Sequence, residues 1–277
     1  MAERASDSPN RGSPSPVRTG RWFDDANPVQ AGSARPKAIL FDLDDTLIAA
    51  HADPDAAWLE ATGHIAGRLG PFRAVDVAAA LSAVSKRFWS DPVDHRHWRF
   101  RVEEARIRVV SLTFGELSRH GHPAPDMQVQ VELAGHFSRI RHDRMRLFPE
   151  THAVLDRLRG MGMRLGLLTN GPGPEQRAKI DRFDLAHRFD LVQIEGEHGF
   201  GKPDDRAYRR ALDALGVEPH ETWMIGDHLE WDVLGPQRNG MRGIWYDIHA
   251  VGLADGTRVV PDRIVHSLSE LIDVSDR

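Results

Sequence analysis

Three aspartates that directly follow a short apolar segment constrain the fold of this chain more than any other stretch. Ala38–Phe41 has the length and side-chain types of a buried parallel strand, and Asp42, Asp44 and Asp45 come next. Carboxylates this close repel one another, so a folded protein keeps them together only with a cation or with raised pKa values. Mg2+ is the obvious cation, because it takes carboxylate oxygens and leaves positions for water and phosphate. These residues alone leave open the other interpretation, an Asp-rich turn without a ligand.

The segment after the aspartates has the periodicity of helices only. Asp53-Pro54 is a typical helix start. Apolar residues then recur at helical spacing over residues 54–69, 74–89, 94–120 and 126–141. About a hundred residues of helix are too long for a simple crossover between two strands, so they indicate an inserted domain. From residue 148 onward helices and strands alternate, and strands are predicted at 163–168, 190–194, 222–225, 243–246 and 263–266.

This alternation predicts an α/β fold, a Rossmann-like doubly wound parallel sheet with an inserted all-helical cap domain. The predicted domains are an α/β core of residues 36–50 and 148–277 and a helical cap of residues 51–147. Residues 1–35 are rich in Ser, Pro, Gly and Arg, with Trp22 and Phe23 as their only large apolar pair. That composition buries too little surface to offset the chain entropy, so we expect a flexible tail rather than a docked segment.

The composition also excludes several classes of function. The chain has no cysteine, which excludes disulfides, thiolate catalysis and cysteine-bound metals. A net charge of -5 gives no general attraction to nucleic acid or to an anionic membrane. No apolar run approaches the length of a membrane span, and the N-terminus lacks the apolar core of a secretory signal. We therefore expect a cytoplasmic protein that acts without nucleic acid or membrane, and the oligomeric state is not indicated.

Three further polar segments follow predicted strands, and parallel strands would bring them to one edge of the sheet. Thr169-Asn170-Gly171 offers a hydroxyl and backbone amides that an anion can approach closely. Lys202, at the start of a predicted helix, can neutralise a phosphate or a carboxylate. Gly226-Asp227 and Asp232 place one carboxylate at a strand end and another about a turn further on. Taken singly, each segment also has an ordinary explanation as a turn, a solvated lysine or the acidic start of a helix.

In their order and placement, the four segments resemble the motifs of the haloacid dehalogenase superfamily. The matches are Phe41-Asp42-Leu43-Asp44-Asp45-Thr46 to motif I, Leu168-Thr169-Asn170-Gly171 to motif II, Gly201-Lys202-Pro203-Asp204 to motif III, and Gly226-Asp227 through Asp232 to motif IV. The resemblance covers residues 37 to about 270, and the helical segment lies where the family's type-1 cap sits. It is closest to the branch that contains N-acylneuraminate phosphatase. The resemblance implies a Mg2+-dependent phosphatase acting on a small-molecule phosphate ester.

The resemblance also implies a role for each matched residue. Asp42 would be the nucleophile that forms an aspartyl-phosphate, and Asp44 would be the general acid and base. Mg2+ would be held by Asp42, by the backbone carbonyl of Asp44, by Asp227 and, as a ligand or a supporting residue, by Asp232. The phosphoryl oxygens would be held by Thr169, Asn170, Gly171 and Lys202, and Lys202 would also assist catalysis. Positioning and charge neutralisation of this kind supply most of the catalysis of phosphoryl transfer.

Three other functions on the same residues remain open. A hydrolytic dehalogenase also uses an aspartate nucleophile, but it needs no acid two residues later, so Asp44 disfavours it. A phosphomutase shares every matched residue and differs only in the group that accepts the phosphoryl. A non-catalytic regulatory member would be expected to lack one of the charged residues, and none is missing.

The predicted cap carries a cluster of cationic residues. They are Arg96, Arg99, Arg101, Arg106 and Arg108, beside His95 and His97. One interpretation is an anion-binding lip for a substrate with a second acidic group. The other, which we favour, is a solvated helix face paired with Glu103 and Glu104. His51 and His228 adjoin the matched motifs, and we expect them to be solvated.

Overall fold

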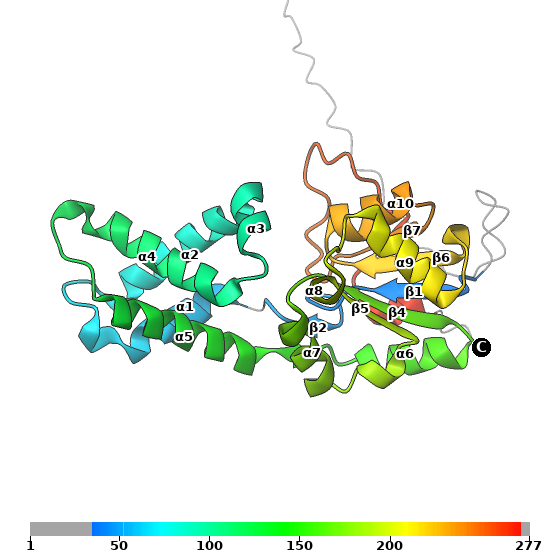
Figure 1. The fold of residues 1–277 in the computed structure, drawn as a ribbon, viewed down its shortest axis with the longest axis horizontal. Coiled ribbons are helices and arrows are strands. Elements are labelled where there is room, and N and C mark those ends of the chain that lie inside the picture. The colour runs from blue at the N-terminus through cyan, green and yellow to red at the C-terminus, as the bar shows by residue number, and fades with distance from the viewer. Residues whose placement is uncertain (1–34, 52, 273–277) are drawn as a thin grey trace, which may run out of the picture.

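A six-stranded parallel sheet forms the centre of the larger lobe of the molecule (Figure 1). The computed structural model describes residues 35–51 and 53–272, so the predicted tail with Trp22 and Phe23 lies outside the described residues except for Arg35. The strand order is β5-β4-β1-β6-β7-β8. The strands are β1 (Ala38–Phe41), β4 (Arg164–Thr169), β5 (Leu191–Ile194), β6 (Thr222–Gly226), β7 (Arg242–Tyr246) and β8 (Arg263–Val265).

The first strand lies in the middle of the sheet and its burial explains its sequence. β1 pairs in parallel with β4 on one side and with β6 on the other, so Phe41 is opposite both Leu167 and Ile225. Every residue from Ala38 to Phe41 is at most 1% exposed, which accounts for an apolar run without alternation. The chain builds outward from β1 through β4 and β5, then returns through β6 to the other half of the sheet. The direction of winding therefore reverses at β1, the place where open α/β sheets bind ligands.

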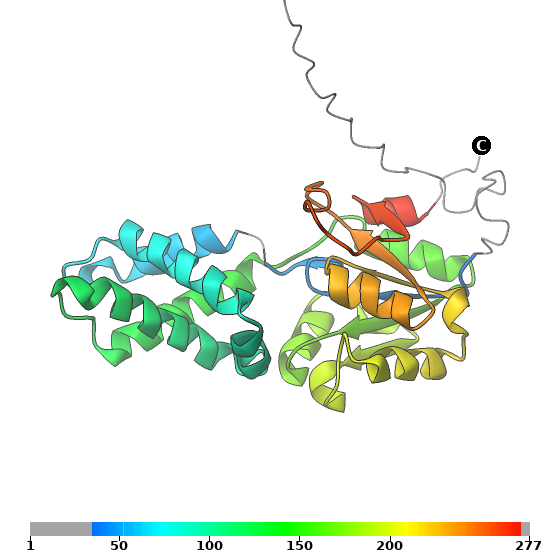
Figure 2. The same ribbon diagram turned by 90° about the horizontal axis from the view of Figure 1, so that it is seen from above.

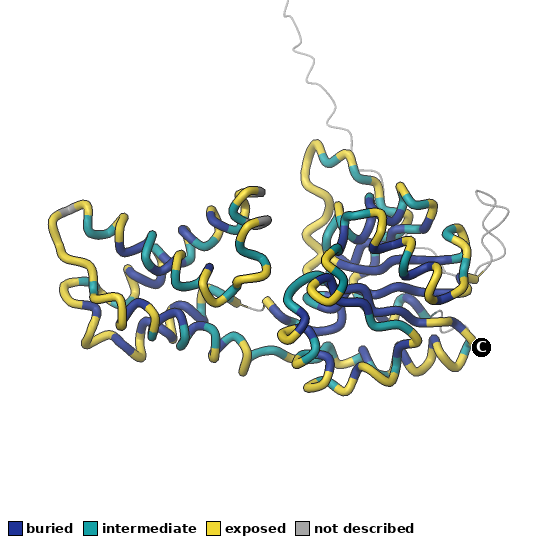
Figure 3. The backbone as a smooth tube through the Cα atoms, viewed as in Figure 1, coloured by how far each residue is buried: buried dark blue, intermediate teal, exposed yellow. Residues whose placement is uncertain are grey.

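Helices cover both faces of the sheet. One face packs against α6 (Thr151–Gly160) and α7 (Gly173–Arg182), whose buried side chains join those of alternate strand residues in a single core. The opposite face packs against α9 (Asp205–Leu215), where Tyr208 and Leu212 meet Leu40. Figure 3 shows the strands as the buried centre of this lobe. The predicted α/β, Rossmann-like sheet is thus confirmed.

Among the described residues, five α-helices form a second lobe with a core of its own, and Figure 2 shows the two lobes side by side. The helices are α1 (Pro54–His64), α2 (Ala74–Ser90), α3 (Pro92–Trp98), α4 (Val102–Leu117) and α5 (Met127–Arg144). Asp53 caps α1 by accepting a hydrogen bond from the Ala56 amide at 2.9 Å, as its position before proline predicts. Trp58 and Phe137 stack at 3.6 Å between ring centres in this core. We propose on this basis the division into a core of residues 36–50 and 148–277 and a cap of residues 51–147.

The prediction of one helix over residues 94–120 is wrong. The segment forms α3 and α4, which are separated at residues 99–101, and the Arg101 amide closes the break by donating to the carbonyl of Trp98 at 2.8 Å. The helical periodicity continues across the break, so the sequence pattern does not reveal it. The break frees Arg99 from either helix face and lets its side chain reach the other lobe. The first cap helix also stops earlier than expected, at His64 rather than near residue 69.

The two connections between the lobes pair with each other, which the sequence did not predict. β2 (Ile48–Ala49) and β3 (Arg146–Leu147) form a two-stranded antiparallel ribbon. Strands of two residues carry no recognisable pattern of alternation, so only the fold reveals them.

Among the described residues, no helix combines the length and the apolar character needed to cross a bilayer.

Candidate active site

Asp42 and Lys202 meet at the carboxyl end of β1. Asp42 is the first residue after the strand, and its amide donates to the carbonyl of Ile225 at 2.9 Å, which continues the pairing with β6. The Lys202 ammonium, 160 residues further along the chain, donates to Asp42 Oδ1 at 2.8 Å and to Asp232 Oδ1 at 2.6 Å. Lys202 is 1% exposed. Burial alone would lower the pKa of Lys202, but the two carboxylates outweigh it and hold the pKa above its ordinary value.

Three of the four predicted metal residues converge at this point. Carboxylate oxygens of Asp42, Asp227 and Asp232 all lie within 4.8 Å of one another. Burial raises the pKa of Asp42 to about 7, against the opposing pull of Lys202, and Asp232 adds repulsion. Burial and the charge of Asp42 raise the pKa of Asp227 to about 8. Asp227 is the exposed member of the three, so solvent weakens the effect of burial on this pKa and the repulsion by Asp42 contributes more. The single charge of Lys202 therefore does not neutralise these three carboxylates. Because the cluster offers only oxygen atoms, it fits a hard divalent cation.

The loop after β6 holds Asp232 in place. Asp232 is fully buried and lies in a π-helical turn, Leu229–Leu234, that follows β6. Its Oδ2 accepts the His228 amide at 3.0 Å. A side chain at Gly226 would place its Cβ 2.2 Å from the same oxygen, so only glycine at this position leaves room for the carboxylate.

Asp44 occupies a different environment from the three converging carboxylates. Lys179 donates to its two oxygens at 2.9 and 2.8 Å, and Gln176 Nε2 donates to Oδ2 at 3.0 Å. Gln176 also donates to the hydroxyl of Thr169 at 2.7 Å, which links Asp44 to the end of β4. Asp44 is therefore not among the three carboxylates that converge within 4.8 Å, and its oxygens are bound by Lys179 and Gln176. Sequence reasoning missed Gln176 and Lys179, although their spacing of three on the helix after motif II places them on one face.

Asn170 and Gly171 make specific contacts that leave only part of the loop available to a ligand. The side chain of Asn170 donates to the Lys202 carbonyl at 2.6 Å and accepts the Lys202 amide at 2.8 Å. This pair of bonds ties motif II to motif III. The Gly171 amide donates to Glu195 Oε2 at 3.2 Å, so in this structure a protein carboxylate takes the place predicted for an anion. Sequence reasoning gave no signal for Glu195, which begins α8 (Glu195–His198).

A cavity of about 470 Å³ lies where the two lobes meet. On the sheet side it is lined by Asp44, Asn170 and Gly171. On the helical side its lining residues include aromatic and cationic side chains: Trp58, Trp89, Phe137, Arg99, Arg106 and Arg141. A small ligand bound at Asp44 would therefore be enclosed by residues of both lobes.

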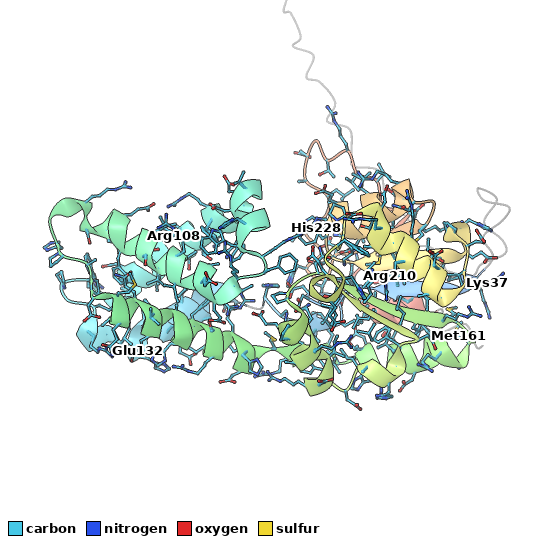
Figure 4. The ribbon with its side chains drawn as sticks, viewed as in Figure 1. Lys37, Arg108, Glu132, Met161, Arg210 and His228 are labelled. Atoms are coloured by element: carbon cyan, nitrogen blue, oxygen red, sulfur yellow. The ribbon has the colours of Figure 1, made fainter. Side chains whose placement is uncertain are left out.

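The predicted arginine cluster divides between the two interpretations. Arg101 pairs with Glu104 at 3.7 Å, and Arg108 is exposed on the helical lobe in Figure 4, as a solvated face predicts. Arg106 pairs with Glu103 at 2.6 Å yet also lines the cavity. Arg99 pairs with Glu195 of the other lobe at 2.6 Å. The side chains of His95 and Arg96 lie outside the described part of the structure.

The two histidines beside the motifs have local partners. His51 lies 2.6 Å from Asp45 and lines the cavity, although its side chain is 57% exposed. His228 stacks on Trp231 with ring centres 4.0 Å apart. Figure 4 places His228 on the side of the sheet lobe that faces the helices.

The parallel sheet thus brings a buried aspartate, a buried lysine and two further carboxylates together at its carboxyl edge, beside a helical lobe. The sequence model of haloacid dehalogenase-like hydrolases matches residues 36–240, and the chain belongs to this family. The resemblance found in the four motifs is thereby confirmed.

Individual relatives agree with this membership. The chain is 37% identical over 225 residues to phosphoserine phosphatase of Thermus thermophilus, covering 76% of this chain and 88% of that protein. It is 26% identical over 248 residues to N-acylneuraminate-9-phosphatase of Rattus norvegicus, covering 87% and 94%. Among solved structures, 2-haloacid dehalogenase of Pseudomonas syringae pv. Tomato is similar, with a TM-score of 0.55, 30% identity and coverage of 85% and 96%. The family and its named phosphatases support a phosphoric monoester hydrolase, as the sequence predicts.

Proposed function

We propose that the chain is a Mg2+-dependent phosphatase that hydrolyses a small phosphomonoester through an aspartyl-phosphate on Asp42. The observation that carries the proposal is the arrangement of two aspartates two residues apart. Asp42 is bound to Lys202 and lies next to the carboxylates of Asp227 and Asp232, whereas Asp44 lines the cavity. The relatives named phosphatases support the same activity. A cytoplasmic location remains a prediction from composition.

The metal would be held by the carboxylates of Asp42, Asp227 and Asp232, with the Asp44 backbone carbonyl as a further oxygen ligand. Bound there, Mg2+ would supply charge neutralisation, which lets the Asp42 carboxylate and a phosphate dianion approach each other. The raised pKa values of Asp42 and Asp227 fit this assignment, because burial and mutual repulsion raise them and a second cation would relieve the repulsion.

The reaction has two halves. In the first, an Asp42 oxygen attacks phosphorus, the bond from phosphorus to the ester oxygen breaks, and Asp44 gives its proton to the leaving alcohol. In the second, water attacks phosphorus, Asp44 takes a proton from that water, and the bond between Asp42 and phosphorus breaks. Asp42 is regenerated and inorganic phosphate leaves. One residue thus acts as acid and then as base.

Lys202, Thr169 and the Asn170 amide would hold the phosphoryl oxygens. Lys202 is bound to Asp42, so its charge lies next to the atom that attacks. Thr169 lies at the end of β4 beside Gln176, which also contacts Asp44. The phosphoryl group and the leaving oxygen would therefore be positioned by the same connected set of side chains.

Two alternatives on the same fold are less well supported. A dehalogenase, like the similar structure from Pseudomonas syringae, would have no use for Asp44, yet Lys179 and Gln176 hold Asp44 at the cavity. A phosphomutase would need a second hydroxyl bound in the cavity to intercept the aspartyl-phosphate in place of water.

The experiment is phosphate release from a panel of small phosphomonoesters, phosphoserine and sugar phosphates included, with Mg2+ and with EDTA. We expect hydrolysis of at least one ester with Mg2+ and none with EDTA. The Asp42→Asn variant keeps the shape of the side chain and should lose activity by orders of magnitude. Asp213→Asn, an exposed aspartate on the outer side of α9, is the matched control and should remain active. Full activity of the Asp42→Asn protein would refute the aspartyl-phosphate.

A further inference from the structure

Glu195 is a buried carboxylate beside the phosphate loop, and no step of the proposed reaction uses it. It directly follows β5 and is 1% exposed. A carboxylate is kept at such a position only when other groups compensate its charge, because burial without a partner is costly. Its partners therefore indicate what the residue does.

The two oxygens of Glu195 contact different lobes of the molecule. Oε2 accepts the amide of Gly171, in the loop that follows β4. Oε1 lies 2.6 Å from Nη2 of Arg99, at the break between α3 and α4. Among the ion pairs of the described residues, this one alone joins the helices of residues 54–144 to the sheet lobe. Neither Glu195 Oε1 nor Arg99 Nε has a hydrogen-bond partner among the described residues, so the contact is an ion pair alone.

Glu195 also packs against the loop that carries Lys202. A Cβ at Gly201 would lie 2.7 Å from the Glu195 Cβ, so glycine at 201 is required for the two segments to touch. The Glu195 carboxylate thus lies between the motif II loop and the motif III loop. Arg99 is the group from the helical lobe that neutralises it.

We propose that Glu195 is a positioning residue that couples phosphate binding to docking of the helical lobe. It fixes the Gly171 amide, and Arg99 cancels its negative charge when the lobes are docked as in this structure. When the helical lobe moves away, Glu195 loses its cation and repels a phosphate dianion at the neighbouring loop. Phosphate binding and lobe docking then favour each other, as thermodynamic linkage requires. This inference rests on the proposed function, since it takes the motif II loop to be the phosphate site.

The test is a double-mutant cycle with inorganic phosphate as the probe, measured by calorimetry in the presence of Mg2+. Arg99→Gln removes the cation that contacts Glu195 and should weaken phosphate binding by about tenfold or more. Glu195→Gln added to Arg99→Gln removes that charge and keeps an acceptor for Gly171, so affinity should return to near the wild-type value. A merely structural contact would give the double variant losses equal to or greater than those of the single one, and that result would overturn the proposal. In ester hydrolysis, Arg99→Gln should raise KM more than it lowers kcat.

A neighbouring ion pair provides the matched control. Glu197 lies two residues from Glu195 and pairs with Arg177 at 2.7 Å. Because both partners of this pair belong to the sheet lobe, Glu197→Gln should leave phosphate affinity unchanged. Because the chain has no cysteine, fluorophores can be attached at Arg119→Cys and Asp213→Cys to follow the distance between the lobes. Phosphate should shorten that distance in the wild type and do so less in Arg99→Gln; identical responses would overturn the coupling. Phosphate binding without hydrolysis of any ester would instead contradict the proposed function alone.

Discussion

Replacing Lys202 with methionine tests whether one buried cation holds the active site together. Lys202 contacts Asp42 and Asp232 at 2.8 and 2.6 Å and is 1% exposed. Methionine keeps much of the apolar stem and removes the charge. The carboxylates then face one another without a cation, and removing one partner of a buried ion pair costs about 3–5 kcal/mol.

The pH dependence of this loss follows from the chemistry of a buried aspartate. An aspartate that loses its cation escapes further repulsion by taking up a proton. Starting from an ordinary pKa of 3.8, protonation costs about 1.4 kcal/mol for each pH unit above that value. The limit for a carboxylate that Lys202 keeps charged is therefore about 4 kcal/mol at pH 7 and about 2 kcal/mol at pH 5. Asp42, whose pKa is already about 7 beside Lys202, adds little to this loss at pH 7. Because the folded state of the variant binds more protons than the unfolded state, the destabilisation should shrink as the pH falls.

The measurement is the free energy of unfolding from urea denaturation in EDTA, at pH 7 and at pH 5, for the wild type and for Lys202→Met. We expect a loss of about 4 kcal/mol at pH 7 and about half of that at pH 5. Lys37→Met is the control, because it removes an exposed ion pair with Glu221 and should leave the denaturation midpoint almost unchanged. A loss below about 1 kcal/mol at pH 7 would refute this account of the site. A loss at pH 5 that equals the loss at pH 7 would refute it as well.

Three further outcomes test the metal site and the acid–base residue. Mg2+ should raise the melting temperature more at pH 8 than at pH 5.5, because two of its carboxylates have pKa values near 7 and 8 and must lose protons to bind it; equal rises at both pH values would contradict this. Gly226→Ala should abolish the Mg2+ response, since its Cβ would lie 2.2 Å from an Asp232 oxygen, whereas Gly63→Ala, with open space around it, should leave the response intact. Asp44→Asn should slow both the formation and the breakdown of the aspartyl-phosphate by roughly 100- to 10,000-fold in single-turnover kinetics; an effect on one step only would assign its second role to another group.

Several features of this protein follow from local sequence alone. A buried central strand needs apolar residues on both faces, so Ala38–Phe41 is recognisable without any knowledge of its neighbours. Alternating helix and strand periodicities predict a parallel sheet, and parallel strands necessarily carry their carboxyl ends to one edge. That is why Asp42, Lys202 and Asp227 could be expected to lie together although 185 positions separate the first from the last.

The tertiary structure alone decided which side chains those residues contact. Asp44 is paired with Lys179, 135 positions away, and Glu195 with Arg99 of the other lobe. Periodicity reports which face of an element is buried, but it does not report what a polar side chain meets across an interface. The break at residues 99–101 is a similar case, because the apolar stripe continues through it and the docking of the lobes determines where Arg99 points. The sequence therefore determines the fold class and the residues at the sheet edge. Tertiary contacts, within the sheet lobe for Asp44 and between the lobes for Glu195, determine how the charges of the site are balanced.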